Sequence, residues 1–162
     1  MKQNNLDKSA QTSTQKFQFI SKKIEQLSQS LVGRIGLAAQ EIGSEDRLII
    51  NGDEAFVMAS TFKVAIAVCL LDLVDKWQLN LSDLIDISPE MIVAGDNVIA
   101  QNLVHQGIKL SLANLIEVMI TQSDNTATDA CIKLAGGPHS ITAKLRSIGI
   151  LDQRLDRDCA EL

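Results

Sequence analysis

The stretch MASTFKVAIAVCLL, residues 58–71, constrains the fold of this chain more than any other. Every residue from Val64 to Leu71 is apolar, which predicts a helix over residues 60–77 that is buried on all sides. Lys63 stands at the start of this helix, although burying an ammonium group is costly unless something uses it. Ser60 lies three residues earlier, and residues at this spacing share a helix face. The Ser60 hydroxyl is therefore expected to lie near the Lys63 amine.

Two interpretations of Ser60 and Lys63 are open. In the first, Ser60 or Thr61 caps the helix and Lys63 extends its amine to solvent. In the second, burial and the positive end of the helix dipole lower the pKa of Lys63, so that a neutral amine lies beside a hydroxyl. Such a pair is a general base next to a nucleophile, and the free N–H groups of the helix start could stabilise an oxyanion. The S-x-x-K spacing alone does not decide between them.

The composition is typical of one globular domain. The chain has 162 residues, of which 46% are hydrophobic, and a formal net charge of −5. Lysines and arginines are scattered, which argues against a nucleic-acid partner, because phosphate binding needs a basic surface. No segment is long and apolar enough for a membrane span, and the N-terminus MKQNNLDKSAQTSTQK lacks the apolar segment of a signal peptide. These features do not indicate a cellular compartment.

Cysteines and histidines are few and dispersed. Cys69, Cys131 and Cys159 form no C-x-x-C pair, and His105 and His139 are isolated. No cluster of these residues has metal-ligand spacing. We therefore expect neither a metal nor a cofactor, and we expect Cys69 and Cys131 to be small core residues.

Periodicity divides the first part of the chain into a tail and a hairpin region. Residues 1–16 are polar and predict a disordered tail. Residues 17–31 carry apolar side chains at 3-4-3-4 spacing, which predicts an amphipathic helix. Residues 32–41 and 48–50 flank the turn GSED, which predicts one β-hairpin.

The remainder of the chain is expected to be mainly helical. Residues 78–109 predict short helical pieces and loops, and residues 150–162 a charged loop. Further helices are expected at 112–120 after a Ser111 cap, from SDNTATD (123–129) to a stop at AGGP (135–138), and at 140–148 before a Gly149 C-cap.

A second polar motif, SDN at residues 123–125, opens one of these helices. Taken alone, it predicts Asp124 or Asn125 as an N-cap. Ser123 adds a second hydroxyl at a helix entrance, and Asn125 adds an amide that can donate and accept hydrogen bonds. S-x-x-K together with S-D-N belongs to the motif set of class A β-lactamases and penicillin-binding proteins.

From about Val32 to Leu162 the chain resembles the class A serine β-lactamases. The resemblance rests on motifs in the family's order and at close to its spacing: MASTFK (58–63), SLANL (111–115) leading into ITQSDNTATD (120–129), AGGP (135–138) and RLDR (154–157). It implies an α+β fold of the β-lactamase/transpeptidase type, with a mainly helical domain and part of an antiparallel sheet. The incomplete domain would span 17–162, with a helix and hairpin at 17–57, a helical part at 58–149 and a truncated active-site loop at 150–162.

The resemblance also implies roles for individual residues. Ser60 would be the nucleophile that opens the β-lactam ring, and its backbone N–H would form half of the oxyanion hole. Lys63 would be a proton-transfer partner, Ser123 would relay a proton towards the ring nitrogen, and Asn125 would hold the side-chain amide of the substrate. The substrate would be a small β-lactam antibiotic, whose breakdown confers resistance. The family implies a periplasmic or secreted bacterial protein.

Two departures from the family's pattern bear on activity. In register with RLDR, Cys159 takes the place of the glutamate that activates the deacylating water, and Ala160 the place of a proline. A thiol is mostly protonated at neutral pH and is a poor general base, and the carboxylates of Asp158 and Glu161 flank that position without occupying it. In addition, no K-T-G or K-S-G occurs in the chain, so we expect the family's C-terminal strands and helix to be absent from it.

These observations leave three functional interpretations. The first is a class A β-lactamase-type serine hydrolase that acts through a Ser60 acyl-enzyme. The second is an acylating but non-hydrolysing penicillin-binding relative or pseudoenzyme, because of Cys159. The third is a truncated, non-enzymatic chain that associates with itself or with a complementing segment, because an incomplete sheet leaves an unpaired edge and uncovered apolar surface.

Overall fold

The computed structural model describes residues 13–95, 98–103 and 107–161. The tail expected at 1–16 falls largely outside the described residues, and its last four positions, 13–16, belong to the first helix. His105 also lies outside the described residues. The chain divides into two compact units, Met1–Val57 and Met58–Leu162.

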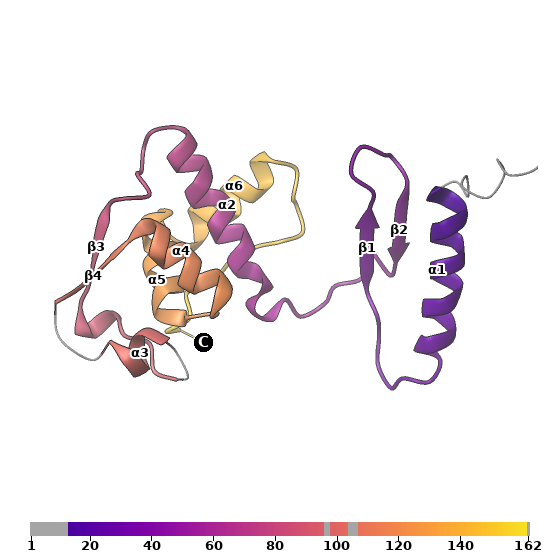
Figure 1. The fold of residues 1–162 in the computed structure, drawn as a ribbon, viewed down its shortest axis with the longest axis horizontal. Coiled ribbons are helices and arrows are strands. Elements are labelled where there is room, and N and C mark those ends of the chain that lie inside the picture. The colour runs from indigo at the N-terminus through magenta and orange to yellow at the C-terminus, as the bar shows by residue number, and fades with distance from the viewer. Residues whose placement is uncertain (1–12, 96–97, 104–106, 162) are drawn as a thin grey trace, which may run out of the picture. The chain divides into compact units, whose positions relative to one another are not determined.

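The first unit consists of a helix beside a two-stranded hairpin (Figure 1). Helix α1 (Ser13–Ser28) packs against β2 (Arg47–Ile50), which pairs antiparallel with β1 (Leu37–Gln40). α1 ends three residues before the predicted end, where the hydroxyls of Ser28 and Ser30 each donate to a backbone carbonyl three residues earlier. β1 is shorter than the predicted strand and starts only after this turn.

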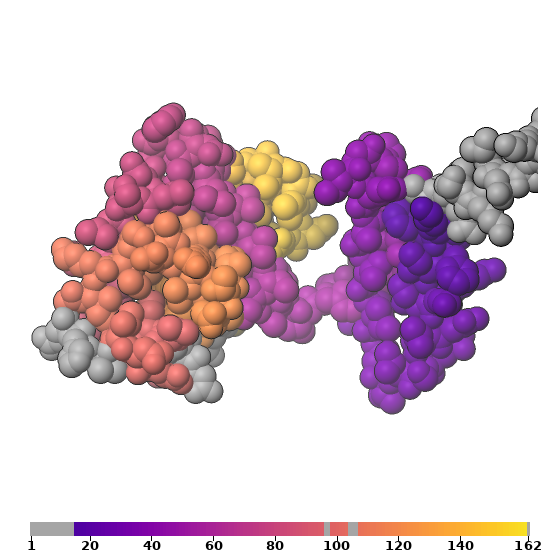
Figure 2. Space-filling view, viewed as in Figure 1, coloured from indigo at the N-terminus to yellow at the C-terminus, as the bar shows by residue number. Residues whose placement is uncertain are grey.

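The second unit is built from helices around one apolar core, and its segments pack closely in the space-filling view (Figure 2). Helix α2 packs against three of the other helices, but the predicted burial on all sides is wrong, because Val64, Val68 and Leu71 form an exposed apolar face. The four main helices are α2 (Phe62–Asp75), α4 (Leu112–Thr121), α5 (Asn125–Leu134) and α6 (Pro138–Ser147). Their fully buried side chains include Ile66, Leu70, Leu112, Leu115, Met119, Cys131 and Ile141.

A second pair of strands lies where the sequence predicts only helical pieces and loops. β3 (Leu84–Ile87) and β4 (Ile108–Ser111) pair antiparallel, on either side of the short helices η2 (Pro89–Met91) and α3 (Val98–Asn102). The prediction missed them because each strand is only four residues long and the partners are far apart in sequence. The helix-rich fold with small antiparallel sheets is the expected α+β class.

A proline begins helix α6 and a glycine follows its end. Helix α6 begins two residues before its predicted start, because Pro138 at its first position has a backbone angle suited to a helix. Gly149 has a φ of 89°, and the N–H groups of Gly149 and Ile150 donate to the carbonyls of Arg146 and Leu145. This is the Schellman arrangement, in which glycine adopts a left-handed conformation at low cost. Among the described residues, no helix has the length and apolar character needed to cross a membrane.

Candidate active site

Ser60 lies in a single helical turn that leads into α2. This turn is η1 (Ala59–Thr61), and Ala59 has a φ of 43°, a left-handed conformation that costs energy for a residue with a side chain. The capping prediction is wrong for both hydroxyls: the N-cap of α2 makes no side-chain capping bond, and Thr61 Oγ1 donates instead to the Met58 carbonyl. Ser60 Oγ accepts a hydrogen bond from Ser123 Oγ at 2.8 Å. The structure thus directs the Ser60 hydroxyl toward the SDN motif.

Lys63 is buried in the first turn of α2, and only 2% of its surface is exposed. Its Nζ donates to Ser123 O at 2.6 Å, to Ser123 Oγ at 3.0 Å and to Asn125 Oδ1 at 2.8 Å. The alternative of an amine that extends to solvent is therefore wrong. The Ser60 hydroxyl and the Lys63 amine are linked through Ser123 Oγ, which hydrogen-bonds to both.

The surroundings of Lys63 change its proton affinity. Burial lowers the pKa of the Lys63 amine below the ordinary value of 10.5, because the charged form loses hydration. The Asp124 and Asp129 carboxylates, and the thiolate form of Cys159 where it is present, act in the opposite direction and raise this pKa, but burial has the larger effect. A lower pKa increases the fraction of neutral amine at any given pH, and only the neutral amine can accept a proton.

Two side chains at the N-terminus of α5 accept hydrogen bonds from α3 and from the loop before it. Asp124 is fully buried and is the N-cap: its Oδ1 accepts from Ala127 N at 2.8 Å, and its Oδ2 from Ile99 N at 2.8 Å. Thr126 Oγ1 accepts from Val93 N at 3.0 Å. Ser123 itself has a left-handed φ of 56°. These contacts and this strained residue fix the position of the Ser123 hydroxyl.

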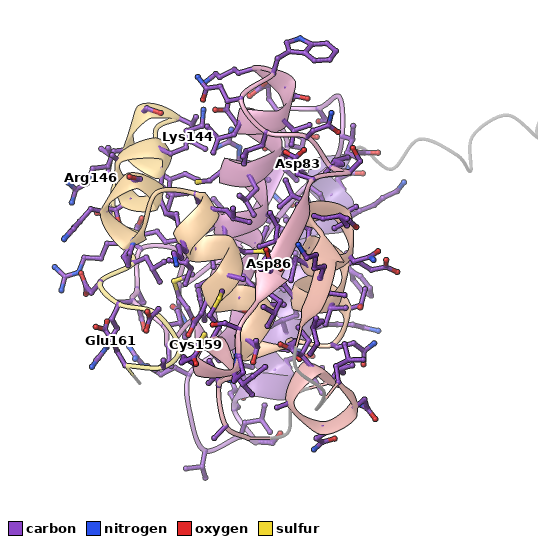
Figure 3. All side chains as sticks on the ribbon, turned by 90° about the vertical axis from the view of Figure 1, so that its left-hand side faces the viewer. Asp83, Asp86, Lys144, Arg146, Cys159 and Glu161 are labelled. Atoms are coloured by element: carbon purple, nitrogen blue, oxygen red, sulfur yellow. The ribbon has the colours of Figure 1, made fainter. Side chains whose placement is uncertain are left out.

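Cys159 lies near Lys63 on the C-terminal segment, close enough for their charges to interact. Its side chain is buried, whereas Glu161 lies farther out on the same segment and is exposed (Figure 3). Burial, followed by the neighbouring Asp129 carboxylate, raises the pKa of the Cys159 thiol to about 12. The second flanking carboxylate, on Asp158, accepts the N–H of Glu161 at 3.1 Å and closes a turn.

Asp129 is a site residue that the sequence interpretation did not single out. Its Oδ1 accepts from Cys159 N at 2.7 Å, and its Oδ2 from Ala160 N at 2.9 Å. It lies four residues after Asn125, and this spacing puts both residues on one face of α5. The four-residue spacing from Asn125 could therefore have identified Asp129 in the sequence.

The other predicted candidates lie outside this cluster. Cys69 and Cys131 are buried in α2 and α5, which agrees with the predicted core role, and both are free thiols. His139 lies on the exposed surface at the start of α6. Across the ranges that the structure describes, no three His, Cys, Asp or Glu side chains are grouped so that they could hold a metal ion.

The chain has relatives among known β-lactamases. The model of the Beta-lactamase enzyme family matches residues 19–162. Over 138 residues the chain is 34% identical to β-lactamase Toho-2 of Escherichia coli, a match that covers 85% of this chain and 47% of the relative. β-Lactamase OXY-2 of Klebsiella oxytoca is also 34% identical, over 146 residues, with coverage of 85% and 47%.

Solved structures give the same result. An ancestral class A β-lactamase superposes with a TM-score of 0.78 and 35% identity, covering 88% of this chain and 54% of that chain. A β-lactamase from Chitinophaga pinensis superposes with a TM-score of 0.82 and 26% identity, covering 86% and 52%.

The fold and the hydroxyl–amine cluster define a protein of the serine β-lactamase type. The chain belongs to the β-lactamase enzyme family, with class A β-lactamases as its relatives. It spans about half the length of the curated relatives it matches.

Proposed function

We propose that this chain carries the nucleophile site of a class A β-lactamase-type serine hydrolase, in which a β-lactam acylates Ser60. One observation carries the proposal: the hydrogen-bonded series from Ser60 Oγ through Ser123 Oγ to the buried Nζ of Lys63. An isolated serine hydroxyl is a weak nucleophile, and a general base linked to it by hydrogen bonds is the usual means of activation.

The proposed acylation step uses each of these groups. Ser60 Oγ forms a bond to the β-lactam carbonyl carbon, while its proton passes through Ser123 Oγ to the neutral amine of Lys63. The bond between that carbon and the ring nitrogen then breaks, and Lys63 returns the proton through Ser123 to the nitrogen. The backbone N–H of Ser60 stabilises the oxyanion, and Asn125 holds the side-chain amide of the substrate.

The state of Cys159 favours a second candidate, an acylating protein that does not hydrolyse its adduct. Hydrolysis requires a base that takes a proton from water. With a pKa of about 12, the Cys159 thiol is protonated at neutral pH and cannot serve as that base. The Glu161 carboxylate is on the exposed side of the same segment. We therefore propose that the acyl-enzyme at Ser60 persists.

The partners of the chain are also proposals. A small β-lactam is the proposed substrate. Association with a second copy or with a complementing segment is proposed because the first unit exposes large apolar side chains, which are typical of a surface that another chain covers.

Labelling with a fluorescent penicillin tests the acylation. We expect the unaltered chain to be labelled and Ser60→Ala to remain unlabelled. Lys63→Met should be labelled about 100- to 10,000-fold more slowly, which is the range for loss of a general base. Ser147→Ala, which removes an exposed hydroxyl from α6, is the matched control and should be labelled normally. Equal labelling of Ser60→Ala would contradict the proposal.

A further inference from the structure

We propose that Asp129 is a positioning residue whose carboxylate holds the backbone N–H groups of Cys159 and Ala160. The same carboxylate keeps the side chain at position 159 protonated, so that this side chain cannot act as a base. The inference rests on the proposed function and goes beyond it, because it assigns the loss of the deacylating base to two residues, Asp129 and Cys159. If both are responsible, a glutamate at position 159 alone should not restore the base.

Both oxygens of the Asp129 carboxylate have backbone donors. Each of its oxygens accepts one backbone N–H, from Cys159 at 2.7 Å and from Ala160 at 2.9 Å. An ionised carboxylate only accepts hydrogen bonds, so two adjacent N–H groups match it. A proline at position 160 would have no N–H to offer. Ala160 and Asp129 are therefore complementary, although they lie 31 residues apart in the chain.

The Cys159 thiol is buried near the same carboxylate. The Cys159 side chain is 8% exposed, and the neighbouring Asp129 carboxylate adds to the effect of burial in raising the pKa of the thiol. The charged groups that act on it are Asp129 and Asp158, which disfavour the thiolate, and Lys63, which favours it. Burial and the two carboxylates have the larger effect, so the thiol keeps its proton.

A glutamate at position 159 would meet a second carboxylate. Its carboxylate would lie beside that of Asp129 in a largely buried place, and two like charges there disfavour ionisation of both. Cys159→Glu alone would therefore stay protonated or turn away from the site. Asp129→Asn removes the charge and keeps one oxygen for the Cys159 N–H. Only the double variant should place an ionised glutamate in the site.

The first test follows the lifetime of the Ser60 adduct with benzylpenicillin by intact mass spectrometry. We expect the single variants Cys159→Glu and Asp129→Asn each to change this lifetime less than about threefold. The double variant should shorten it more than about 100-fold, as expected for a restored general base. If Cys159→Glu alone shortens the lifetime as much as the double variant does, the proposal for Asp129 is overturned.

The second test needs no substrate. The pKa of Cys159 is measured by NMR of ¹³C-labelled cysteine, with the signal assigned from Cys159→Ser. Asp129→Asn should lower this pKa, because it removes a neighbouring negative charge. Asp158→Asn is the matched control and should lower it less, since Asp158 has the smaller influence on the thiol. An unchanged Cys159 pKa in Asp129→Asn would overturn the proposal.

A third measurement applies if Asp129→Asn does not fold. Ala160→Pro removes one N–H donor from Asp129 while leaving its charge in place, so the pKa of the Asp129 carboxyl should rise. An unchanged pKa of the Asp129 carboxyl, measured by ¹³C NMR, would contradict the proposed pairing of Asp129 with Ala160. Absence of any Ser60 adduct in the unaltered chain would refute the proposed function, whereas the two NMR titrations would still decide the role of Asp129.

Discussion

The two units differ in how much of their apolar surface is buried. In the first unit, Leu48 is the one buried hydrophobic residue among those that the structure describes, while Val32 and Ile42 are fully exposed. In the second unit, side chains such as Ile66, Leu115 and Met119 are completely buried and form one core. All of the proposed catalytic groups belong to the second unit.

The buried core of the second unit supports the proposed catalytic groups. Lys63 lies at the start of the same helix whose later residues form the core, and Asp124 holds the SDN segment from inside that core. The first unit exposes apolar side chains and has no such core among its described residues, which is typical of a surface that binds another chain. We therefore expect substitutions in the two units to have unequal effects.

The largest expected effect comes from a matched pair of leucines. Leu115→Ala removes a fully buried side chain from the second unit and should cost about 2–5 kcal/mol of unfolding free energy. Leu27→Ala makes the same chemical change at a position in α1 that is 66% exposed, and should change stability by no more than about 0.5 kcal/mol. Urea denaturation measures both. Equal losses would show that the first unit buries Leu27 against something else.

A smaller effect is expected at the buried cap. Asp124→Ala leaves the N–H groups of Ile99 and Ala127 without their acceptor inside the protein, which should cost about 1–3 kcal/mol. Ser44→Ala removes a comparable acceptor from the Asp46 N–H in the first unit, where solvent can replace it, and should cost less than about 1 kcal/mol. Thermal melts of both variants check the difference. A larger loss for Ser44→Ala would contradict it.

Acylation at Ser60 is also expected to depend on pH. The pKa of Lys63 is lowered from 10.5, so the neutral base forms at a lower pH than for an ordinary lysine. The acylation rate should rise about tenfold per pH unit below that pKa and then level off before pH 10.5 is reached. Stopped-flow labelling with a penicillin at several pH values measures the profile. A rate that keeps rising through 10.5, or that falls as pH rises, would contradict Lys63 as the base.

Part of the fold can be predicted from local sequence signals. The apolar run after Lys63 predicts α2, and Ser111 caps α4 as predicted, with its hydroxyl accepting the N–H of Asn114. These features depend on residues within one or two turns of each other. β3 and β4 escaped prediction because their pairing joins short segments that are distant in sequence, and no local pattern encodes such a pairing.

The site divides in the same way. The motifs identify Ser60, Lys63, Ser123 and Asn125, and the structure brings these four together. The bonds from Asp129 to the Cys159 segment join residues 30 apart, so spacing could not predict them. The left-handed backbone at Ala59 was likewise invisible, because alanine carries no preference for that conformation.

Intact mass spectrometry after incubation with benzylpenicillin shows whether Ser60 is acylated. The purified chain is measured after minutes and after hours, with Ser60→Ala as the control. We predict an adduct of one penicillin at both times in the unaltered chain and none in Ser60→Ala. A chain that forms no adduct at either time would contradict the claim that its Ser60, Ser123 and Lys63 cluster is an acylation site.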